Sequence, residues 1–132
     1  MTPLMHQLDP TRPLGDQLVE EFSRLIAIGE WEPGSRVPSV RTLAVDVGVN
    51  PATVQKALTA LQERGLLIVQ STAGRFVTRD EDRIAATLIE LATVHAHEFV
   101  AHMQALKIEP EKAQQLVHRE WKLVEEKEAN GE

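Results

Sequence analysis

The segment that decides the fold is Pro38–Val54, with the sequence PSVRTLAVDVGVNPATV. Ser39 is a favourable N-cap, and the apolar residues that follow it at helical spacing predict a helix of about two turns. Gly48 is the residue type that ends a helix in a left-handed conformation. Asn50 then caps a second helix, with Pro51 at its first position. The segment therefore predicts a helix-turn-helix unit.

The second helix of this unit has one apolar and one polar face. Val54, Ala57, Leu58 and Leu61 recur at helical spacing and are expected to be buried. The opposite face carries no carboxylate and consists of Ala52, Thr53, Gln55, Lys56 and Thr59. Small and polar side chains suit base edges and phosphates in the major groove of DNA. A helical hairpin whose polar face is only solvated is the simpler alternative. It is disfavoured because the two N-caps, the glycine turn and the apolar faces of both helices all fit a helix-turn-helix.

The flanking segments predict a winged helix. Pro13 opens a helix that ends near Gly29, and a turn at 31–34 precedes a very short strand at 36–37. Gly65 is expected to end the second helix of the unit. Two short apolar runs, 66–69 and 76–78, flank a turn at 71–74 and predict a hairpin, the wing. The expected fold class is mainly α with a small β-wing.

The ordered series of residues over 12–79 resembles the DNA-binding domain of the GntR family of bacterial transcription regulators. The matching residues are Leu14, Gln17, Leu18, Gly29, Pro33, Gly34, Pro38, Ser39, Arg41, Leu43, Ala44, Gly48, Val49, Asn50, Pro51, Thr53, Val54, Lys56, Ala57, Leu58, Leu61, Gly65, Leu66, Gly74, Phe76 and Val77. Two positions depart from the family pattern. The segment 72–75 replaces the Gly-x-Gly-Thr often found before the Phe-Val of the wing, and Gly15 replaces a common Tyr.

Nine residues are predicted to contact DNA. Arg41 is long enough to reach a phosphate or the O6/N7 edge of guanine, and the resemblance implies that it contacts DNA; a surface ion pair with Asp46 or a glutamate is the alternative. Arg75 is expected at the wing tip, either in the minor groove or solvated. The complete set of predicted DNA-binding residues is Arg36, Ser39, Arg41, Asn50, Ala52, Thr53, Gln55, Lys56 and Arg75.

The charge distribution supports this assignment although the net charge of the chain is −6. Residues 36–79 hold six basic and two acidic residues, a net charge of +4, whereas residues 80–132 hold 6 basic and 12 acidic ones. A basic N-terminal domain with an acidic tail orients the protein on DNA. We therefore expect a winged helix-turn-helix domain over residues 1–79 and a separate tail domain over residues 80–132.

The tail is predicted to form two amphipathic helices, one of about 25 residues that begins near Asp82 and one that follows the break at Ile108–Pro110. Two helices cannot bury both apolar stripes against each other, which favours a symmetric dimer. The predicted dimerisation residues are Ile84, Leu88, Leu91, His95, Phe99, Met103, Leu116 and Trp121. A short helical tail of this kind is similar to the YtrA-type subgroup of the GntR family.

Four of the five histidines fall in the tail, and His95, Glu98 and His102 share one helical face. A metal site is conceivable there, but an amphipathic helix face is the favoured interpretation, and we predict no metal and no cofactor. The sequence offers no obvious pocket for a small-molecule effector, which would have to lie between the dimer helices; its existence and identity stay open.

The leading functional hypothesis is a homodimeric, sequence-specific DNA-binding regulator, most simply a repressor, on a palindromic operator. The alternative is a winged-helix module that binds protein and does not read DNA. An enzyme is disfavoured, because the sequence contains no nucleophile–base pair, phosphate loop or paired carboxylates. The absence of cysteine, of a signal peptide and of an apolar run near 20 residues predicts a cytoplasmic protein without a membrane segment.

Overall fold

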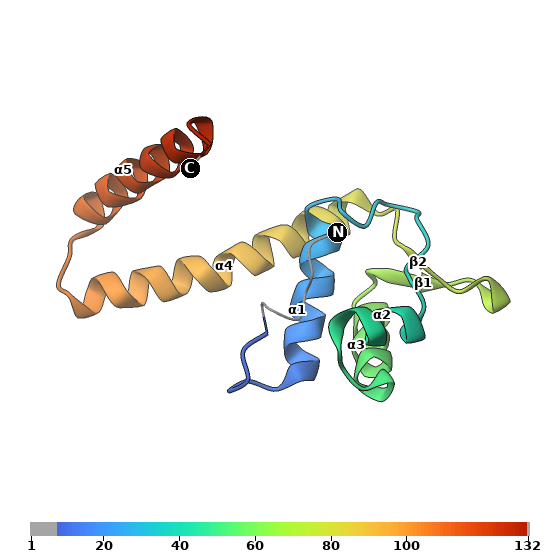
Figure 1. Cartoon of the computed structure of the whole chain (residues 1–132). Helices are drawn as coiled ribbons and strands as arrows, with labels where there is room; N and C mark the ends of the chain where they lie inside the picture. Colours follow the sequence, from blue (N-terminus) through green and yellow to red (C-terminus); the bar gives the residue numbers. More distant parts are fainter. Residues whose placement is uncertain (1–7, 132) are drawn as a thin grey trace. The chain divides into compact units, whose positions relative to one another are not determined.

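The computed structural model describes residues 8–131 of the chain. It consists mainly of helices, with one small antiparallel sheet (Figure 1). The helices are α1 (Leu14–Ala27), α2 (Val40–Val47), α3 (Pro51–Glu63), α4 (Glu81–Ala105) and α5 (Pro110–Ala129). The strands are β1 (Leu67–Val69) and β2 (Arg75–Val77), with a 3₁₀ turn at Ser71–Ala73 between them. The predicted fold class, mainly helical with a small wing, is confirmed.

The contacts divide the chain into two compact units, and the division falls inside α4 between Leu91 and Ala92. It does not fall after residue 79, where we predicted the domain boundary, because the first turns of α4 pack with the N-terminal unit. Ile84 is half-buried against the core of that unit, and Thr87 is buried beside it in the same helix.

The helix-turn-helix forms through the local signals in its sequence. Ser39 Oγ accepts a hydrogen bond from the Thr42 N–H at 3.1 Å and so caps α2. Gly48 ends α2 in the left-handed region, with φ 77°. Asn50 Oδ1 accepts a hydrogen bond from the Ala52 N–H at 2.7 Å and caps α3, with Pro51 at the first helical position. Each predicted cap and the turn are present.

The core of the N-terminal unit joins α1, α2, α3 and the sheet. Phe22 of α1 stacks on Trp31, with ring centroids 5.2 Å apart. The largest fully buried side chains are Leu18, Phe22, Ile26, Leu43, Val47, Val54, Leu58, Leu61, Leu66 and Val77. Because these residues come from α1, α2, α3, β2 and the residue before β1, their burial fixes the helix-turn-helix on α1 and on the base of the wing.

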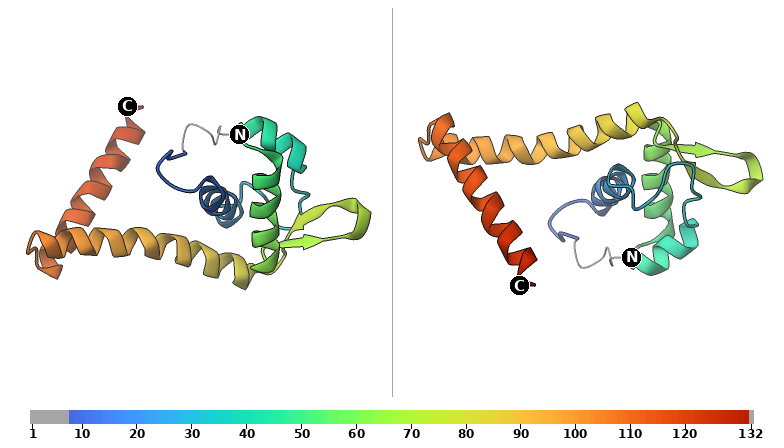
Figure 2. Two further views of the ribbon diagram at one scale, coloured as in Figure 1. Left: turned by 90° about the horizontal axis from the view of Figure 1, so that it is seen from below. Right: turned by 90° about the horizontal axis from the view of Figure 1, so that it is seen from above.

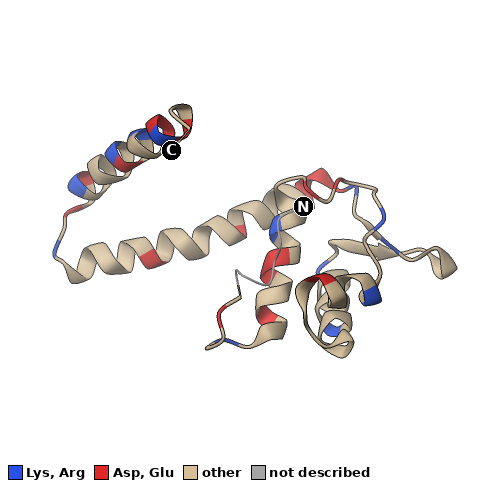
Figure 3. Cartoon of the chain, in the orientation of Figure 1, with Lys and Arg blue, Asp and Glu red and all other residues tan. Residues whose placement is uncertain are grey.

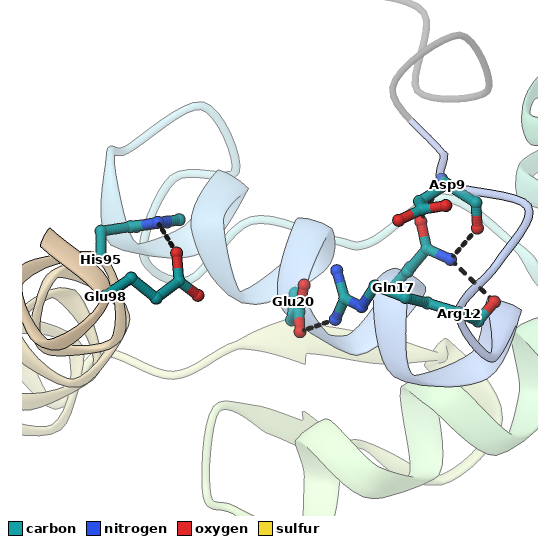
Figure 4. Close-up of polar contacts among 6 residues, drawn as sticks. All are labelled: Asp9, Arg12, Gln17, Glu20, His95 and Glu98. Atoms are coloured by element: carbon teal, nitrogen blue, oxygen red, sulfur yellow. Dashed lines mark hydrogen bonds and ion pairs between the residues drawn. The ribbon is translucent and has the colours of Figure 1, made fainter. Parts of the chain in front are cut away.

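The buried Gln17 of α1 holds the segment before this helix in place. Its Nε2 donates hydrogen bonds to the carbonyls of Asp9 and Arg12, at 2.6 and 3.0 Å, and its Oε1 accepts one from the Asp9 N–H (Figure 4). The buried amide of Gln17 is thereby satisfied by main-chain groups. This arrangement fixes the entry of the chain into α1.

The wing is the hairpin of β1 and β2, which projects from the end of α3 in both views of Figure 2. In its register Leu67 pairs with Val77, Ile68 with Phe76 and Val69 with Arg75. The very short strand predicted at residues 36–37 is present as a single β-bridge between Arg36 and Phe76. The wing base is therefore flanked by a third extended segment.

The second unit contains the rest of α4 and all of α5. A groove of about 830 Å³ lies between the two helices, and its apolar lining includes Phe99, Met103, Ile108, Val117 and Trp121. The side chain of Trp121 is 66% exposed in the single chain. Within residues 92–131 no side chain is buried, so this unit has an extended apolar surface and no interior.

The expectation that no segment has the apolar length of a membrane span was wrong for α4. By length and composition alone, Glu81–Ala105 is the one helix in the described part of the chain that could cross a membrane. The sequence reasoning missed this because it looked for an uninterrupted apolar run, whereas α4 interleaves apolar residues with alanines, histidines and two glutamates after its first turn. Charged side chains of this kind are costly inside a bilayer.

Candidate nucleic-acid interface

The α3 polar face presents three of its five predicted residues openly to solvent. Ala52, Gln55 and Lys56 are exposed, whereas Thr53 and Thr59 are half-buried. Thr53 is covered on one side by α1, where its Cγ2 lies 3.9 Å from the position that a Cβ on Gly15 would take. The only carboxylate of α3 is Glu63, the last residue of the helix. The face therefore combines amide, ammonium and small side chains with no negative charge in its first three turns.

The N-terminal turns of α2 and α3 add hydrogen-bond donors to the helix-turn-helix. Ser39 and Asn50 satisfy one N–H group each, and both capping residues are exposed. The remaining N–H groups of these turns and the helix dipoles attract anions. Both caps have their predicted structural role, and contact of these residues with DNA stays a prediction.

Arg41 is exposed in the first turn of α2. Within residues 8–131 no ion pair engages it, so the alternative of a salt bridge to Asp46 or a glutamate is not realised in the structure. A guanidinium group without an acidic partner retains all its donors for a phosphate or a guanine edge.

Arg75 does not lie at the wing tip, where the sequence analysis placed it. It is the first residue of β2 and pairs with Val69, and the tip is the turn Ser71–Ala73. Its Nε donates a hydrogen bond to Gln62 Oε1 of α3 at 3.3 Å, and its side chain is half-buried. Arg75 therefore connects the wing to α3 and is not a free, solvated charge.

Arg36 lies at the base of the wing and is exposed. Its guanidinium group rests against Gly74: a Cβ added to Gly74 would lie 3.1 Å from Arg36 Nε. Figure 3 shows the basic residues of α2, α3 and the strands, with no acidic residue on the hairpin. The predicted DNA-binding residues thus come from α2, α3, the wing and the segment before α2.

The acidic and basic groups with shifted pKa values belong to α1 and the segment before it. A hydrogen bond from Thr11 lowers the pKa of Asp9, and hydrogen bonds from their guanidinium groups to Glu20 and Glu21 raise the pKa of Arg12 and Arg24. These arginines are therefore paired with carboxylates, unlike Arg41. Substitution of Arg12 or Arg24 therefore serves as a control for the loss of one positive charge away from α2 and α3.

Seven of the eight predicted dimerisation residues lie outside the core of the N-terminal unit. The exception is Ile84, which packs against that core and is withdrawn from the dimer surface for this reason. Leu88 and Trp121 are exposed, and Leu91, Phe99, Met103 and Leu116 are half-buried. His95 is exposed too, and its Nδ1 lies 4.0 Å from Glu98 Oε2 (Figure 4).

The histidines of α4 are not gathered into a metal site. In the part of the chain that the structure describes, no three histidine or carboxylate side chains lie close enough to hold an ion. A His–Glu pair one helical turn apart is a common surface arrangement.

Sequence reasoning missed two residues that shape this surface, Gln62 and Gly74. Gln62 accepts the hydrogen bond of Arg75, 13 positions further along the chain, and no local pattern indicates such a contact. Gly74 was expected as the last residue of the wing turn and as part of the family pattern, but its contact with Arg36 was not expected; this contact and its positive φ of 107° define the end of the turn. A glycine after a turn is the one signal that could have pointed to it.

The fold of the N-terminal unit is a winged helix-turn-helix. Residues 14–77 match the family described as bacterial regulatory proteins, gntR family. The chain also resembles the solved structure of a GntR family transcriptional regulator from Listeria monocytogenes, at 30% identity and a TM-score of 0.80, over 85% of this chain and 98% of that one. The chain belongs to the GntR family: it is a DNA-binding transcription regulator and not an enzyme.

Two further proteins extend the comparison. The HTH-type transcriptional repressor YtrA of Bacillus subtilis is 32% identical over 88 residues, which are 65% of this chain and 65% of that repressor. The match thus spans just under two thirds of the length of this relative. A transcriptional regulator from Oenococcus oeni, at 21% identity and a TM-score of 0.70, covers 85% of this chain and 93% of that one and shares the fold. The predicted resemblance to YtrA-like regulators is confirmed.

Proposed function

We propose that the chain acts as a homodimeric repressor that binds a palindromic operator in bacterial DNA. The observation that carries the proposal is the α3 polar face, where Gln55 and Lys56 are exposed and no carboxylate interrupts the face. Arg41, which no ion pair engages within residues 8–131, lies in α2, the other helix of the helix-turn-helix. Regulation by blocking a promoter fits a chain that is 32% identical to a transcriptional repressor over 88 residues. The cytoplasm is the expected location, because the operator is there.

In the proposed complex, α3 lies in the major groove, as the second helix of a helix-turn-helix does. Gln55 has the donor–acceptor amide that reads adenine, and Arg41 has the fork that reads guanine or meets a phosphate. The capped N-termini of α2 and α3 face the phosphate backbone. Phosphate contacts set the position of the protein, and the few base contacts set its sequence preference.

The proposed dimer forms through the second unit. Apolar side chains of α4 and α5, among them Phe99, Val117 and Trp121, line an open groove. Burial of each large apolar side chain contributes roughly 1.5–3 kcal/mol, which favours a second copy of the same helices over exposure to water. A two-fold axis through such an interface relates two α3 helices and calls for a palindromic site. Such an interface would also bury the apolar side chains of α4 without a membrane.

The first experiment is selection of duplexes from a random pool, followed by binding titrations of the selected sequence at several salt concentrations. We expect affinity to fall linearly in log[salt], as phosphate contacts require. Arg41→Ala should weaken specific binding by at least tenfold. Arg24→Ala, which removes an arginine paired with Glu21 in α1, is the matched control and should bind like the wild type.

Two outcomes would contradict the proposal. If no duplex is enriched and none is retarded at low salt, the chain does not read DNA, and the protein-interaction module becomes the better hypothesis. If the selected site has no two-fold symmetry and the complex contains one chain, the dimer proposal fails while DNA binding stands. Addition of small metabolites to the same titration tests for an effector.

A further inference from the structure

Two arginines with different surroundings lie at the wing: Arg75 belongs to β2, and Arg36 belongs to the segment before α2 that pairs with β2. We propose that Arg36, with its guanidinium group seated on Gly74, is the cation with which the wing contacts a phosphate of the duplex. Arg75 then serves to hold the wing on α3. This inference rests on the proposed function, since it requires a bound duplex, and it specifies which side chain of the wing makes the contact.

The backbone places Arg36 on the outer face of the wing. The Val37 N–H donates to the Arg75 carbonyl and the Val77 N–H donates to the Ser35 carbonyl, both at 2.9 Å, so the segment before α2 runs antiparallel along β2. Arg36 is directly opposite Phe76 in this pairing. Since side chains alternate along a strand, Phe76 and the position two residues before it, Gly74, share the face of Arg36.

Gly74 provides the space in which the guanidinium group lies. A Cβ at this position would be 3.1 Å from Arg36 Nε, 3.3 Å from Nη2 and 3.6 Å from Cζ. The closest of these separations is shorter than an ordinary van der Waals contact between carbon and nitrogen. A side chain at residue 74 would therefore push the guanidinium group away by a few tenths of an ångström, because the end of an arginine moves more easily than the hairpin backbone.

The charge of Arg36 has no acidic partner within residues 8–131. From Leu66 to Arg79 the chain contains no aspartate or glutamate, so the hairpin itself does not neutralise it. A guanidinium group that is exposed, unpaired and restricted by contact with the backbone loses less conformational entropy when it binds an anion. Arg36 thus has the properties of a preorganised phosphate ligand.

Arg75 lies on the opposite face of β2, since it is adjacent to Phe76 in the strand. Its Nε is engaged by Gln62 Oε1, and the side chain is half-buried between the wing and α3. A contact of Arg75 with DNA would require it to leave this position. Its present geometry therefore assigns it a positioning role.

The test compares Arg36→Gln with Arg75→Gln, two variants that each remove one positive charge and retain a polar side chain. Both are titrated with the selected duplex over a range of salt concentrations. We expect Arg36→Gln to weaken binding by about tenfold and to lower the slope of log K against log[salt] by about one. Arg75→Gln should change this slope by less than half as much. Equal slopes for Arg36→Gln and wild type, or a larger change for Arg75→Gln, would overturn the proposal.

A second set of variants tests the contact between Gly74 and the Arg36 guanidinium group. Gly74→Ala should weaken binding in the wild-type background by several-fold, because it displaces the Arg36 guanidinium group. In the Arg36→Gln background the same substitution should cost less than twofold, since no guanidinium group is left to displace. The backbone strain of alanine at positive φ is common to both backgrounds. Losses of equal size in both would show that Gly74 acts independently of Arg36.

The wild-type protein and Arg41→Ala separate this inference from the proposed function. If the wild type binds no duplex, the proposed function fails and the wing contact fails with it. If the wild type binds, Arg41→Ala weakens binding and Arg36→Gln does not, only the wing assignment fails. Circular dichroism melting of each variant establishes that the variants compared are folded.

Discussion

Gly15 in the first turn of α1 lies against Thr53 in the first turn of α3, so that a Cβ on Gly15 would be 3.9 Å from Thr53 Cγ2. This contact accounts for the half-burial of Thr53 and brings two helix N-termini together. A separation of 3.9 Å is an ordinary van der Waals distance, so the structure has room for an alanine at residue 15 but not for a large side chain in the same direction.

We therefore expect Gly15→Ala to stabilise the N-terminal unit. Alanine loses less backbone entropy than glycine on folding into a helix, and its methyl group would contact Thr53 without displacing it. The free energy of unfolding should rise by about 0.5 kcal/mol, measured by urea denaturation. A lower midpoint for this variant would mean that the two helices approach more closely than the structure indicates.

The opposite result is expected for Gly48→Ala. Gly48 ends α2 with φ 77°, a region in which a Cβ is disfavoured by roughly 1–2 kcal/mol. The variant should lose stability of that order, and Gly48→Asn should lose less, because asparagine tolerates the left-handed region better. Urea denaturation of both variants gives the comparison; equal stability of Gly48→Ala and wild type would contradict the turn geometry.

Asn50 allows the capping role to be separated from contact with DNA. Asn50→Asp keeps an oxygen acceptor for the Ala52 N–H and places a negative charge at a helix N-terminus, where it is favourable. We expect unchanged or slightly higher stability by thermal melting, together with at least tenfold weaker binding of the selected duplex, because the carboxylate repels phosphate.

Asn50→Ala is the matched variant. It removes the cap and should lower the free energy of unfolding by about 1 kcal/mol, without adding a charge. If Asn50→Asp binds DNA as tightly as the wild type does, the first turn of α3 does not face the phosphate backbone.

Trp121 reports on the proposed dimer. The chain contains two tryptophans, of which Trp31 is buried and Trp121 is 66% exposed in the single chain. In a Trp31→Phe variant, the remaining emission comes from Trp121. We expect this emission to move to shorter wavelength, and iodide quenching to weaken, as the protein concentration rises through the dimer dissociation constant.

Val117→Glu tests the same surface by sedimentation. Val117 lines the groove between α4 and α5, and a buried carboxylate there should weaken the dimer by at least tenfold. Gln115→Glu introduces the same charge at an exposed position of α5 and should leave the dimer intact. Identical sedimentation of Val117→Glu and wild type would exclude the groove as the interface.

These experiments retain the full chain for a structural reason. A chain cut after residue 79, at the domain boundary expected from the sequence, would lose Ile84 from the core of the N-terminal unit. A change in its association would then mix loss of the tail with partial unfolding. Point substitutions in α5 avoid this ambiguity.

The sequence was sufficient for the helix-turn-helix because each signal there acts over a few residues. Ser39 caps the helix that begins at the next residue, Gly48 ends the same helix, and Asn50 caps α3. Such hydrogen bonds depend on local backbone geometry and residue type. For the same reason the helical periods of α4 and α5 were predicted well, with the first of them within one residue of its observed start.

Only the tertiary structure decided where the side chains of Arg75, Arg36 and Ile84 lie. The hydrogen bond between Arg75 and Gln62 and the seating of Arg36 on Gly74 depend on the register of the hairpin and on the angle at which it meets α3. The packing of Ile84 depends on where the chain turns into α4. Contacts of this kind join residues distant in sequence, whose separation is set by packing of the whole core, and no local pattern of residue types encodes that distance.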